Sequence, residues 1–372
     1  MNRVHAVIWA AAASLLIGGC GSNKSGDVFI GIAIPETQVT RWIKDGEALK
    51  AAAEKRGYRA EVQFADGDQS IQNREIQSFL TVGAKLIVVG SINDAIAPVI
   101  AEAAQKKVPV IAYDRLIPNS ADYDYYITFN NYKVGVLKGQ CLAEALKLEE
   151  ATEAAPKYIT LFAGAPTDGN ASFFYDGAVS VLNPYIEKGA LKVVGPYAKT
   201  SGDREIFLKL ATENWQGPIA KARMEAMLKA EAADVALDAI LAPNDFISRN
   251  IMEAVKADPK YKDKLPLITG QDAEFESAML IKNGEQLCTV FKNTATLAEA
   301  AIILADQILK GQTPDIPGAV LASGELEKIG DTGKKVVKAY LLDPVLVTKE
   351  NLNVPMDAGF YTAAETEELT RQ

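Results

Sequence analysis

Histidine and cysteine are scarce in this chain, and their scarcity removes several classes of chemistry. The 372 residues include one histidine, His5, and three cysteines. His5 lies in an N-terminal segment that we expect to be cleaved, so the mature chain would contain no imidazole. Serine–histidine catalysis, cysteine–histidine catalysis and histidine-ligated metal sites are therefore excluded. We expect no catalytic residues, no cofactor and no metal ion.

Positive charge is also in deficit. Lysine and arginine total 39 against 48 acidic residues, which gives a formal net charge of -9. Such a chain has no electrostatic attraction for phosphate backbones, so we expect no nucleic-acid partner. Hydrophobic residues make up 48% and charged residues 23%, a composition typical of a well-packed globular protein. The length predicts about two domains.

The N-terminus carries an apolar run from Val4 to Ile17, which is short for a bilayer span but suits the core of a signal peptide. The run ends at Ile17-Gly18-Gly19-Cys20, which resembles the bacterial lipobox, where cleavage precedes a cysteine that accepts a diacylglycerol. We expect residues 1–19 to be a lipoprotein signal peptide, Cys20 to be the lipid anchor and residues 20–26 to be a flexible tether. The alternative is an ordinary secretory signal with a chance cysteine nearby. Either way the body would be exported, to the periplasmic or the extracellular face of a membrane.

The two remaining cysteines, Cys141 and Cys288, each lie in apolar surroundings. We expect two buried free thiols. Because an oxidising compartment would permit a bridge, a disulfide between them is the alternative.

Short β-branched runs alternate with amphipathic stretches along the rest of the chain. The predicted strands lie in 28–34, 60–65, 85–90 and 108–113, and again in 158–164, 191–197, 235–243 and 265–271. The predicted helices of the second set lie around 172–188, 219–232 and 246–257. Buried strands joined by helices predict a parallel, doubly wound α/β sheet, and the repetition of the pattern predicts a second lobe of the same kind.

Polar residues follow most of these strands, where an open parallel sheet binds ligands. They are Arg41 and Trp42, Asp114 and Arg115, Asp168 and Asn170, Asn244 and Asp245, Asp272, and Lys292. Helix capping is the alternative for Asn170 and Asp245, which occupy positions where an N-cap is expected. Capping does not explain Arg41, Arg115 or Lys292, because cations at a helix start oppose the helix dipole.

The mature chain would retain two tryptophans, Trp42 and Trp215. A flat indole beside acids, amides and arginines suits a pyranose, which has apolar faces and a rim of hydroxyls. The alternative is that both side chains serve packing or a lid.

Several strings together resemble one known family. They are TRWIKDG, IAYDRLI, ITFNNYKVGVL, FFYDGA, ITGQDAE and VFKNT, and they resemble the periplasmic sugar-binding proteins of ABC importers, in the xylose-binding and multiple-monosaccharide-binding branch. The similarity runs from Val28 to about residue 352. It implies a type I binding-protein fold, with two α/β lobes, a three-strand hinge and an aldopyranose such as xylose, galactose, glucose or arabinose held between the lobes.

The resemblance also implies residue roles and a division of the chain. The implied sugar-binding residues are Arg41, Trp42, Asp114, Arg115, Asn170, Trp215, Asp245, Asp272 and Lys292. The implied first lobe takes 27–130 plus 293–318, and the implied second lobe takes 131–292 plus 319–372. The loop 165–170 and Asn244 depart from the family pattern, which leaves the preferred sugar open.

The implied partners are a monosaccharide and the membrane permease of an ABC importer, with the protein itself a monomer. An alternative output is presentation of the bound sugar to a chemoreceptor or a sensor kinase. Glycoside hydrolysis by Asp114, Asp245 and Asp272 is disfavoured, because the neighbouring arginines and lysine would keep these acids charged. A sugar-responsive transcription regulator would carry a helix-turn-helix where this chain has its signal segment. Asp66-Gly67-Asp68 lacks the later ligands of a calcium loop and indicates a turn.

Overall fold

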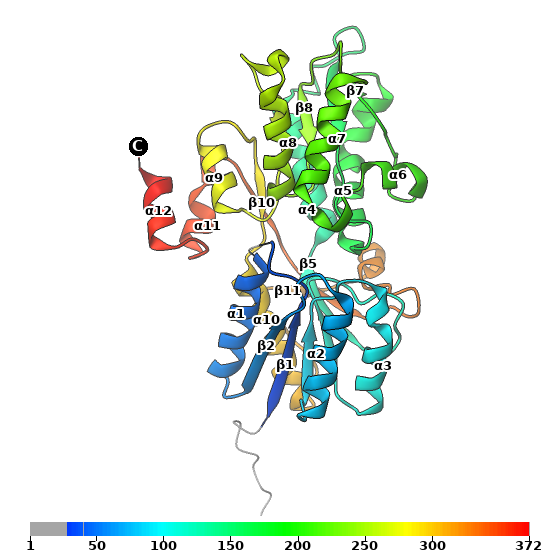
Figure 1. The fold of residues 1–372 in the computed structure, drawn as a ribbon, viewed down its shortest axis with the longest axis vertical. Helices are drawn as coiled ribbons and strands as arrows, with labels where there is room; N and C mark the ends of the chain where they lie inside the picture. The colour runs from blue at the N-terminus through cyan, green and yellow to red at the C-terminus, as the bar shows by residue number, and fades with distance from the viewer. Residues whose placement is uncertain (1–27, 40, 372) are drawn as a thin grey trace, which may run out of the picture.

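The computed structural model describes residues 28–39 and 41–371, which form two α/β lobes stacked along the longest axis of the molecule (Figure 1). The predicted signal peptide, the lipid anchor Cys20 and the tether 20–26 lie outside the described residues. Among the helices that are described, none has both the length and the apolar character that a bilayer crossing requires.

The first lobe contains a seven-stranded sheet in the order β11-β12-β5-β4-β3-β1-β2. Its strands are β1 (Phe29–Ile34), β2 (Arg59–Phe64), β3 (Leu86–Val89), β4 (Val110–Tyr113), β5 (Tyr125–Phe129), β11 (Ala319–Leu321) and β12 (Lys338–Leu342). All neighbours pair in parallel except β11, the antiparallel edge strand. The apolar runs are continuous because both faces of the sheet are covered by helices.

Alternate residues of β1 explain how the two faces are covered. Ile30 and Ile32 pack with α1 (Arg41–Lys55) and α10 (Thr294–Leu309). Phe29 and Ala33 face the other side, with α2 (Gln69–Thr81) and α3 (Ala97–Gln105). Helices therefore lie on both sides of the sheet, and the carboxyl ends of its central strands point toward the second lobe (Figure 1).

The second lobe contains a four-stranded parallel sheet in the order β7-β6-β8-β9. Its strands are β6 (Lys157–Leu161), β7 (Leu191–Val193), β8 (Ala239–Leu241) and β9 (Leu267–Ile268), and β10 (Thr289–Phe291) pairs antiparallel with β13 (Val345–Val347). Its helices are α4 (Asn131–Ala145), α5 (Gly169–Glu187), α6 (Arg204–Leu210), α7 (Gly217–Lys229), α8 (Asp245–Ala257) and α9 (Phe275–Lys282). Helices α7 and α8 pack on one face, and α4 and α5 on the other.

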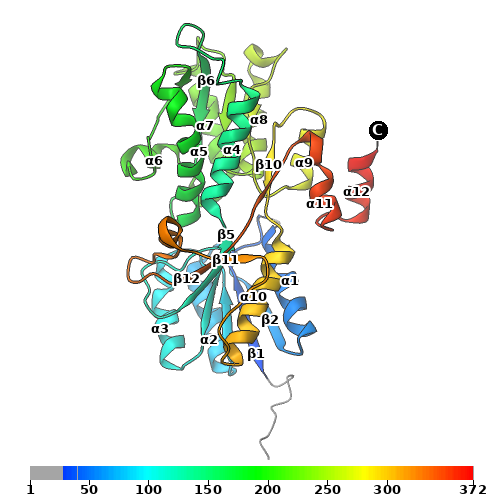
Figure 2. The ribbon, with the colours of Figure 1, turned by 180° about the vertical axis from the view of Figure 1, so that it is seen from behind.

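The chain passes between the lobes three times, from β5 to α4, from β10 to α10 and from β12 to β13. The tail then forms α11 (Asn353–Asp357) and α12 (Ala363–Thr370) beside α9 (Figure 2). Short 3-10 turns complete the fold at 94–96, 213–215, 259–261, 324–330 and 349–351. Three crossings of this kind make a hinge about which the lobes can close on a ligand.

The expected division of the chain needs one correction. It gives 319–372 to the second lobe, but β11 and β12 lie in the first sheet, and β12 pairs in parallel with β5 over its full length. Ala339 and Leu341 of β12 are buried in the first-lobe core. The segment 319–342 therefore belongs to the first lobe, because its strands β11 and β12 complete the seven-stranded sheet.

Cys141 and Cys288 are both buried and unbridged, which confirms the expectation of two free thiols. Burial and a hydrogen bond with Cys141 raise the pKa of the Cys288 thiol. The two thiols, from α4 and from the residue before β10, are therefore neighbours inside the second lobe.

Candidate functional site

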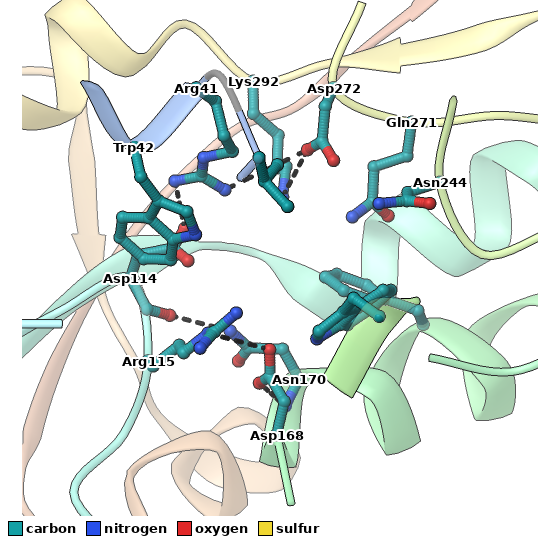
Figure 3. Close-up of a pocket in the computed structure, with 13 residues that line it drawn as sticks. Arg41, Trp42, Asp114, Arg115, Asp168, Asn170, Asn244, Gln271, Asp272 and Lys292 are labelled. Atoms are coloured by element: carbon teal, nitrogen blue, oxygen red, sulfur yellow. Dashed lines mark hydrogen bonds and ion pairs between the residues drawn. The ribbon is translucent and has the colours of Figure 1, made fainter. Parts of the chain in front are cut away.

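A pocket that encloses about 350 Å³ of empty space, including the part open to solvent, lies between the two lobes (Figure 3). The first lobe contributes Val39, Arg41, Trp42, Asp114 and Arg115. The second lobe and its crossing contribute Asp168, Asn170, Phe174, Trp215, Asn244, Gln271, Asp272 and Lys292. Eight of the nine sequence-predicted binding residues thus meet in one cavity.

Strand ends place most of these side chains. Asp114 and Arg115 come directly after β4, Gln271 and Asp272 follow β9, and Lys292 follows β10. Because parallel strands end at the same edge of a sheet, residues far apart in sequence converge there. The two sheets present these edges to each other, and the pocket lies where they meet.

The Arg41 guanidinium connects the two lobes. Its Nη2 lies 2.7 Å from Oδ2 of Asp45 and 3.0 Å from Oδ1 of Asp114, both in the first lobe. Its Nη1 lies 4.0 Å from Oδ1 of Asp272 in the second lobe, and Lys292 Nζ lies 3.0 Å from the same oxygen (Figure 3). All of these charged groups are buried, so their attraction is little screened by water.

These contacts shift the ionisation of the site. Burial alone would raise the pKa of Asp114, but Arg41 and Lys292 outweigh it and hold this pKa below its ordinary value. Burial also disfavours the charged form of Arg41. The carboxylates of Asp114, Asp45 and Asp272 outweigh this effect and raise the pKa of Arg41 well above its ordinary value. Asp114 and Arg41 are therefore charged at neutral pH.

A second link between the lobes lies on the opposite side of the pocket. Nε of Arg115 lies 3.1 Å from Oδ2 of Asp168 (Figure 3). The Asn170 amide donates to the backbone carbonyl of Asp114 at 2.8 Å, and its oxygen accepts from Asn131 at 2.7 Å and from the Tyr126 hydroxyl at 3.1 Å. Asn170 is thereby fixed in one orientation.

Both predicted tryptophans line the pocket, in different surroundings. The guanidinium carbons of Arg41 and Arg115 lie 4.6 Å and 5.0 Å from the Trp42 ring centroid. The Trp215 indole lies against Gly164, where an added Cβ would come within 2.1 Å of the ring. Its buried Nε1–H finds no hydrogen-bond acceptor in the part of the chain that the structure describes.

The backbone is strained at three lining residues. Asp114 has φ 60°, Trp215 has φ 57° and Asp272 has φ 92°, a left-handed conformation that costs a non-glycine residue about 1–3 kcal/mol. Strain of this kind is retained where the surrounding structure requires it, and it clusters at binding and catalytic sites. The three side chains are held in the cavity by this geometry.

Asp245 is the predicted binding residue that the structure does not place in the pocket lining. It is the first residue of α8, and its carboxylate turns away from the pocket to accept from the Glu274 backbone N–H at 2.9 Å and from Thr289 at 3.0 Å. Gln286 also donates to it, at 2.9 Å. Burial raises the pKa of Asp245 well above its ordinary value. Asp245 therefore ties Glu274, two residues after Asp272, to the segment 286–289.

The observed helix N-caps lie one or two residues before the positions expected from the sequence. The N-caps of α5 and α8 are Asp168 and Asn244, and not Asn170 and Asp245. Both caps line the pocket. Both are among the polar residues that follow the predicted strands, whereas Gln271, Phe174 and Val39 carry no such signal. For Gln271 the available signal was its position directly before Asp272.

The described residues contain no group of three or more histidine, cysteine or acidic side chains arranged to hold a metal ion. The lining instead combines three aromatic side chains, fixed charges and amides. Such a set binds a neutral polar molecule by hydrogen bonds and by contact with a flat face.

Comparisons with known proteins match most of the length of the chain to the same kind of protein. A family model described as a periplasmic binding protein domain matches residues 30–313. The multiple sugar-binding periplasmic receptor of Rhizobium radiobacter is 38% identical over 338 residues, which cover 90% of this chain and 91% of the relative. The D-xylose-binding periplasmic protein of Escherichia coli is 30% identical over 365 residues, which cover 98% of this chain and 99% of the relative.

A solved structure from Clostridium phytofermentans, an ABC transporter solute-binding protein with bound β-D-glucose, has a TM-score of 0.81 at 35% identity and covers 91% of this chain and 99% of that chain. The sequence resemblance and the type I fold that it implied are thereby confirmed. The protein belongs to the periplasmic binding protein family.

Proposed function

We propose that this protein binds a monosaccharide in the pyranose form between its lobes and delivers it to the permease of an ABC importer. The observation that carries the proposal is the single cavity in which Trp42, Trp215 and charged or amide groups from both lobes meet. Members of this family bind solutes and are not enzymes. The lowered pKa of Asp114 also removes it as a proton donor for glycoside hydrolysis.

The chemistry of the lining matches the two surfaces of a sugar. Carboxylates such as Asp114 and Asp272 accept from ring hydroxyls, and Arg41 donates to hydroxyl and ring oxygens. The Trp215 N–H and the Gln271 Oε1, both buried without partners among the described residues, supply one further donor and one further acceptor. The indole planes suit the apolar C–H faces of a pyranose.

The contacts between lobes explain how binding and closure are coupled. The Arg41–Asp272 and Arg115–Asp168 pairs form only when the lobes are together. Opening the hinge exposes these charges to water, and closing it buries them. A sugar that hydrogen-bonds to groups on both lobes stabilises the closed state and shifts the population toward it.

Similarity to proteins of known ligand supports a broad class rather than one sugar. Solved structures at 35% and 32% identity hold β-D-glucose and D-glucose, and a relative at 30% identity is a D-xylose-binding protein. We therefore place the ligand among the aldopyranoses, with xylose, glucose, galactose and arabinose as the members to test.

The N-terminal pattern extends this proposal to location. Ile17-Gly18-Gly19-Cys20 supports export followed by lipid attachment at Cys20, which would tether the body to the outer face of a membrane near its permease. Presentation of the bound sugar to a chemoreceptor or a sensor kinase remains the alternative output. It uses the same site.

A panel of sugars tests the function directly. Thermal unfolding of residues 20–372 is followed with and without D-xylose, D-glucose, D-galactose, L-arabinose and D-ribose, because a ligand that binds only the folded state raises the unfolding temperature. We expect at least one aldopyranose to raise it and calorimetry to give one site per chain. Absence of any shift, or sustained release of reducing sugar from glycosides, would refute the proposal.

A further inference from the structure

A second cavity adjoins the proposed sugar pocket at the mouth of the cleft. It encloses about 1010 Å³ of empty space, including the part open to solvent. It shares Arg115, Asp168 and Trp215 with the first pocket. A group attached to a molecule in the first pocket could therefore reach the second cavity past these three residues, once the Arg115–Asp168 ion pair makes room for it.

The remaining side chains of this cavity have the chemistry that binds hydroxyl groups. The first lobe contributes Pro35, Glu36, Gln38, Asp66, Gly67, Ile92 and Asn93, and the second contributes Ala165, Thr167, Asn214 and Gln216. Carboxylates and side-chain amides predominate. These groups accept from and donate to hydroxyls, and both lobes supply them, so a bound unit would interact with both lobes at once.

The wall between the two cavities is polar and can contact a bridging oxygen. Arg115 lies there between Asp168, at 3.1 Å, and Glu36, whose Oε1 lies 3.7 Å from Nη2. Arg115 therefore lies where two sugar units would be joined, with a donor available for the linking oxygen.

The outer rim is closed by a contact that a ligand can replace. Gln216 Nε2 donates to Gln38 Oε1 at 3.0 Å, from one lobe to the other, and the contact is solvent-exposed. A neutral amide pair of this kind contributes about 0.5–1.5 kcal/mol, and hydroxyl groups can satisfy both amides instead.

The opposite side of the sugar pocket is closed by more contacts, which involve three buried charged side chains and a further bridge between the lobes. The cavity there shares Arg41 and Asp272 with the sugar pocket, so an extension in that direction would have to separate the ion pairs of Arg41 and Lys292 with Asp272. Lys44, which donates to the Phe360 carbonyl at 3.1 Å, further bridges the lobes on that side.

We propose that the cavity at the mouth is a second carbohydrate subsite, which holds a sugar unit or other hydroxylated group joined to the first sugar through a glycosidic oxygen. The ligands of the protein then include glycosides and disaccharides as well as free monosaccharides. This inference rests on the proposed function, because the first unit occupies the pocket described above.

Calorimetry with matched pairs of sugars tests the subsite. D-glucose is compared with methyl glucosides, cellobiose, maltose and gentiobiose, and D-xylose is compared with xylobiose. We expect at least one disaccharide to bind within about tenfold of its parent monosaccharide, a difference of about 1.4 kcal/mol.

A blocking variant assigns the binding to this cavity. Gln216 precedes α7 and makes no side-chain capping bond, so Gln216→Trp fills the rim without removing a cap. It should weaken disaccharide binding at least about tenfold more than monosaccharide binding, which loses no more than the contribution of the Gln216–Gln38 contact. The matched control, Glu276→Trp, places the same bulk on the exposed start of α9 beside the opposite cavity and should change neither affinity.

The outcomes separate the two proposals. Monosaccharide binding with every glycoside weaker by more than about a hundredfold, or equal loss of both ligands in Gln216→Trp, overturns the subsite alone. If neither monosaccharides nor glycosides bind to the folded protein, the proposed function fails and the subsite fails with it.

Discussion

Arg41 of the first lobe and Asp272 of the second approach to 4.0 Å between Nη1 and Oδ1, with both side chains buried. Each side chain also has a second charged partner. Arg41 pairs with Asp45 of the first lobe, and Asp272 pairs with Lys292, which follows β10 of the second lobe. The contact therefore joins two preformed ion-pair networks when the lobes close. The charges that would contact a ligand are already oriented before it arrives.

Removal of the Asp272 carboxylate should weaken sugar binding strongly. Asp272→Ala leaves Lys292 buried without its anionic partner and takes away an acceptor for sugar hydroxyls, so we expect a loss of about 2–5 kcal/mol in binding free energy. Asp114→Ala should behave alike, because it strips a carboxylate from Arg41. Calorimetry measures both, with the exposed Asp263→Ala as control. Unchanged affinity in both variants would remove these acids from the site.

Gly164→Ala should impair binding through the indole of Trp215. The added Cβ would meet the ring within 2.1 Å, so the indole must move out of its place in the pocket wall. We expect a drop in affinity of about tenfold or more, with destabilisation of roughly 1–3 kcal/mol from overpacking. Gly169→Ala, where an added Cβ meets nothing within 4 Å, is the matched control. Equal affinities in the two variants would show that the position of Trp215 does not matter to the ligand.

Asp245 should act as a positioning residue. Asp245→Ala leaves Gln286, Thr289 and the Glu274 N–H without their acceptor, which should destabilise the fold by roughly 1–3 kcal/mol. We expect weaker sugar binding as well, because Asp272 lies next to these segments. Asp245→Asn keeps one acceptor oxygen and should restore most of both properties. Urea unfolding and calorimetry on both variants check this, and a failure of asparagine to improve on alanine would contradict the assigned role.

Lys138 should make stability depend on pH. Its Nζ donates to the Pro243 carbonyl at 3.0 Å, and burial lowers its pKa to about 7. Asp272, Lys292, Cys288 and Asp245 surround it. In the unfolded chain this lysine has its ordinary pKa of about 10.4. Between these values the unfolded chain binds a proton that the native state has released, so native stability rises with pH over this window.

Comparison with Lys138→Met isolates this contribution. The free energy of unfolding of the original protein minus that of the variant should increase by about 1.4 kcal/mol per pH unit between about pH 7 and 10. Below that window both states carry the proton and the difference should be constant. Urea unfolding of both proteins at several pH values measures it. A difference that stays flat up to pH 9 would show that Lys138 is charged in the native state.

Most of the site could be predicted because one rule relates sequence to space. Asp114, Arg115 and Asp272 follow short apolar strands, and the ends of parallel strands converge whatever the sequence distance between them. The residue types at Asp114 and Asp272 do not indicate a left-handed backbone. The direction in which these two side chains point could therefore not be predicted from the sequence. Trp215 lies in an irregular turn, and it was predicted because it is one of only two tryptophans in the expected mature chain.

The errors have local physical causes. Asn244 and Asp245 are adjacent acceptors at one helix start, and the sequence pattern does not say which enters the pocket and which turns back to the protein. Strand β12 is short and lies far along the chain from its partner β5, so its pairing depends on contacts that no local periodicity reports. The sequence therefore gives no local reason to assign β12 to the first lobe rather than to the second.

The place of β12 has a consequence for how the polypeptide acquires its structure. The first sheet is incomplete until residues 338–342 have been synthesised and inserted beside β5. A chain interrupted before this point lacks β12 and leaves β11 without a strand to pair with, so β5 is left as an open edge able to pair wrongly. The first lobe therefore reaches its full set of strands only when nearly the whole polypeptide is available.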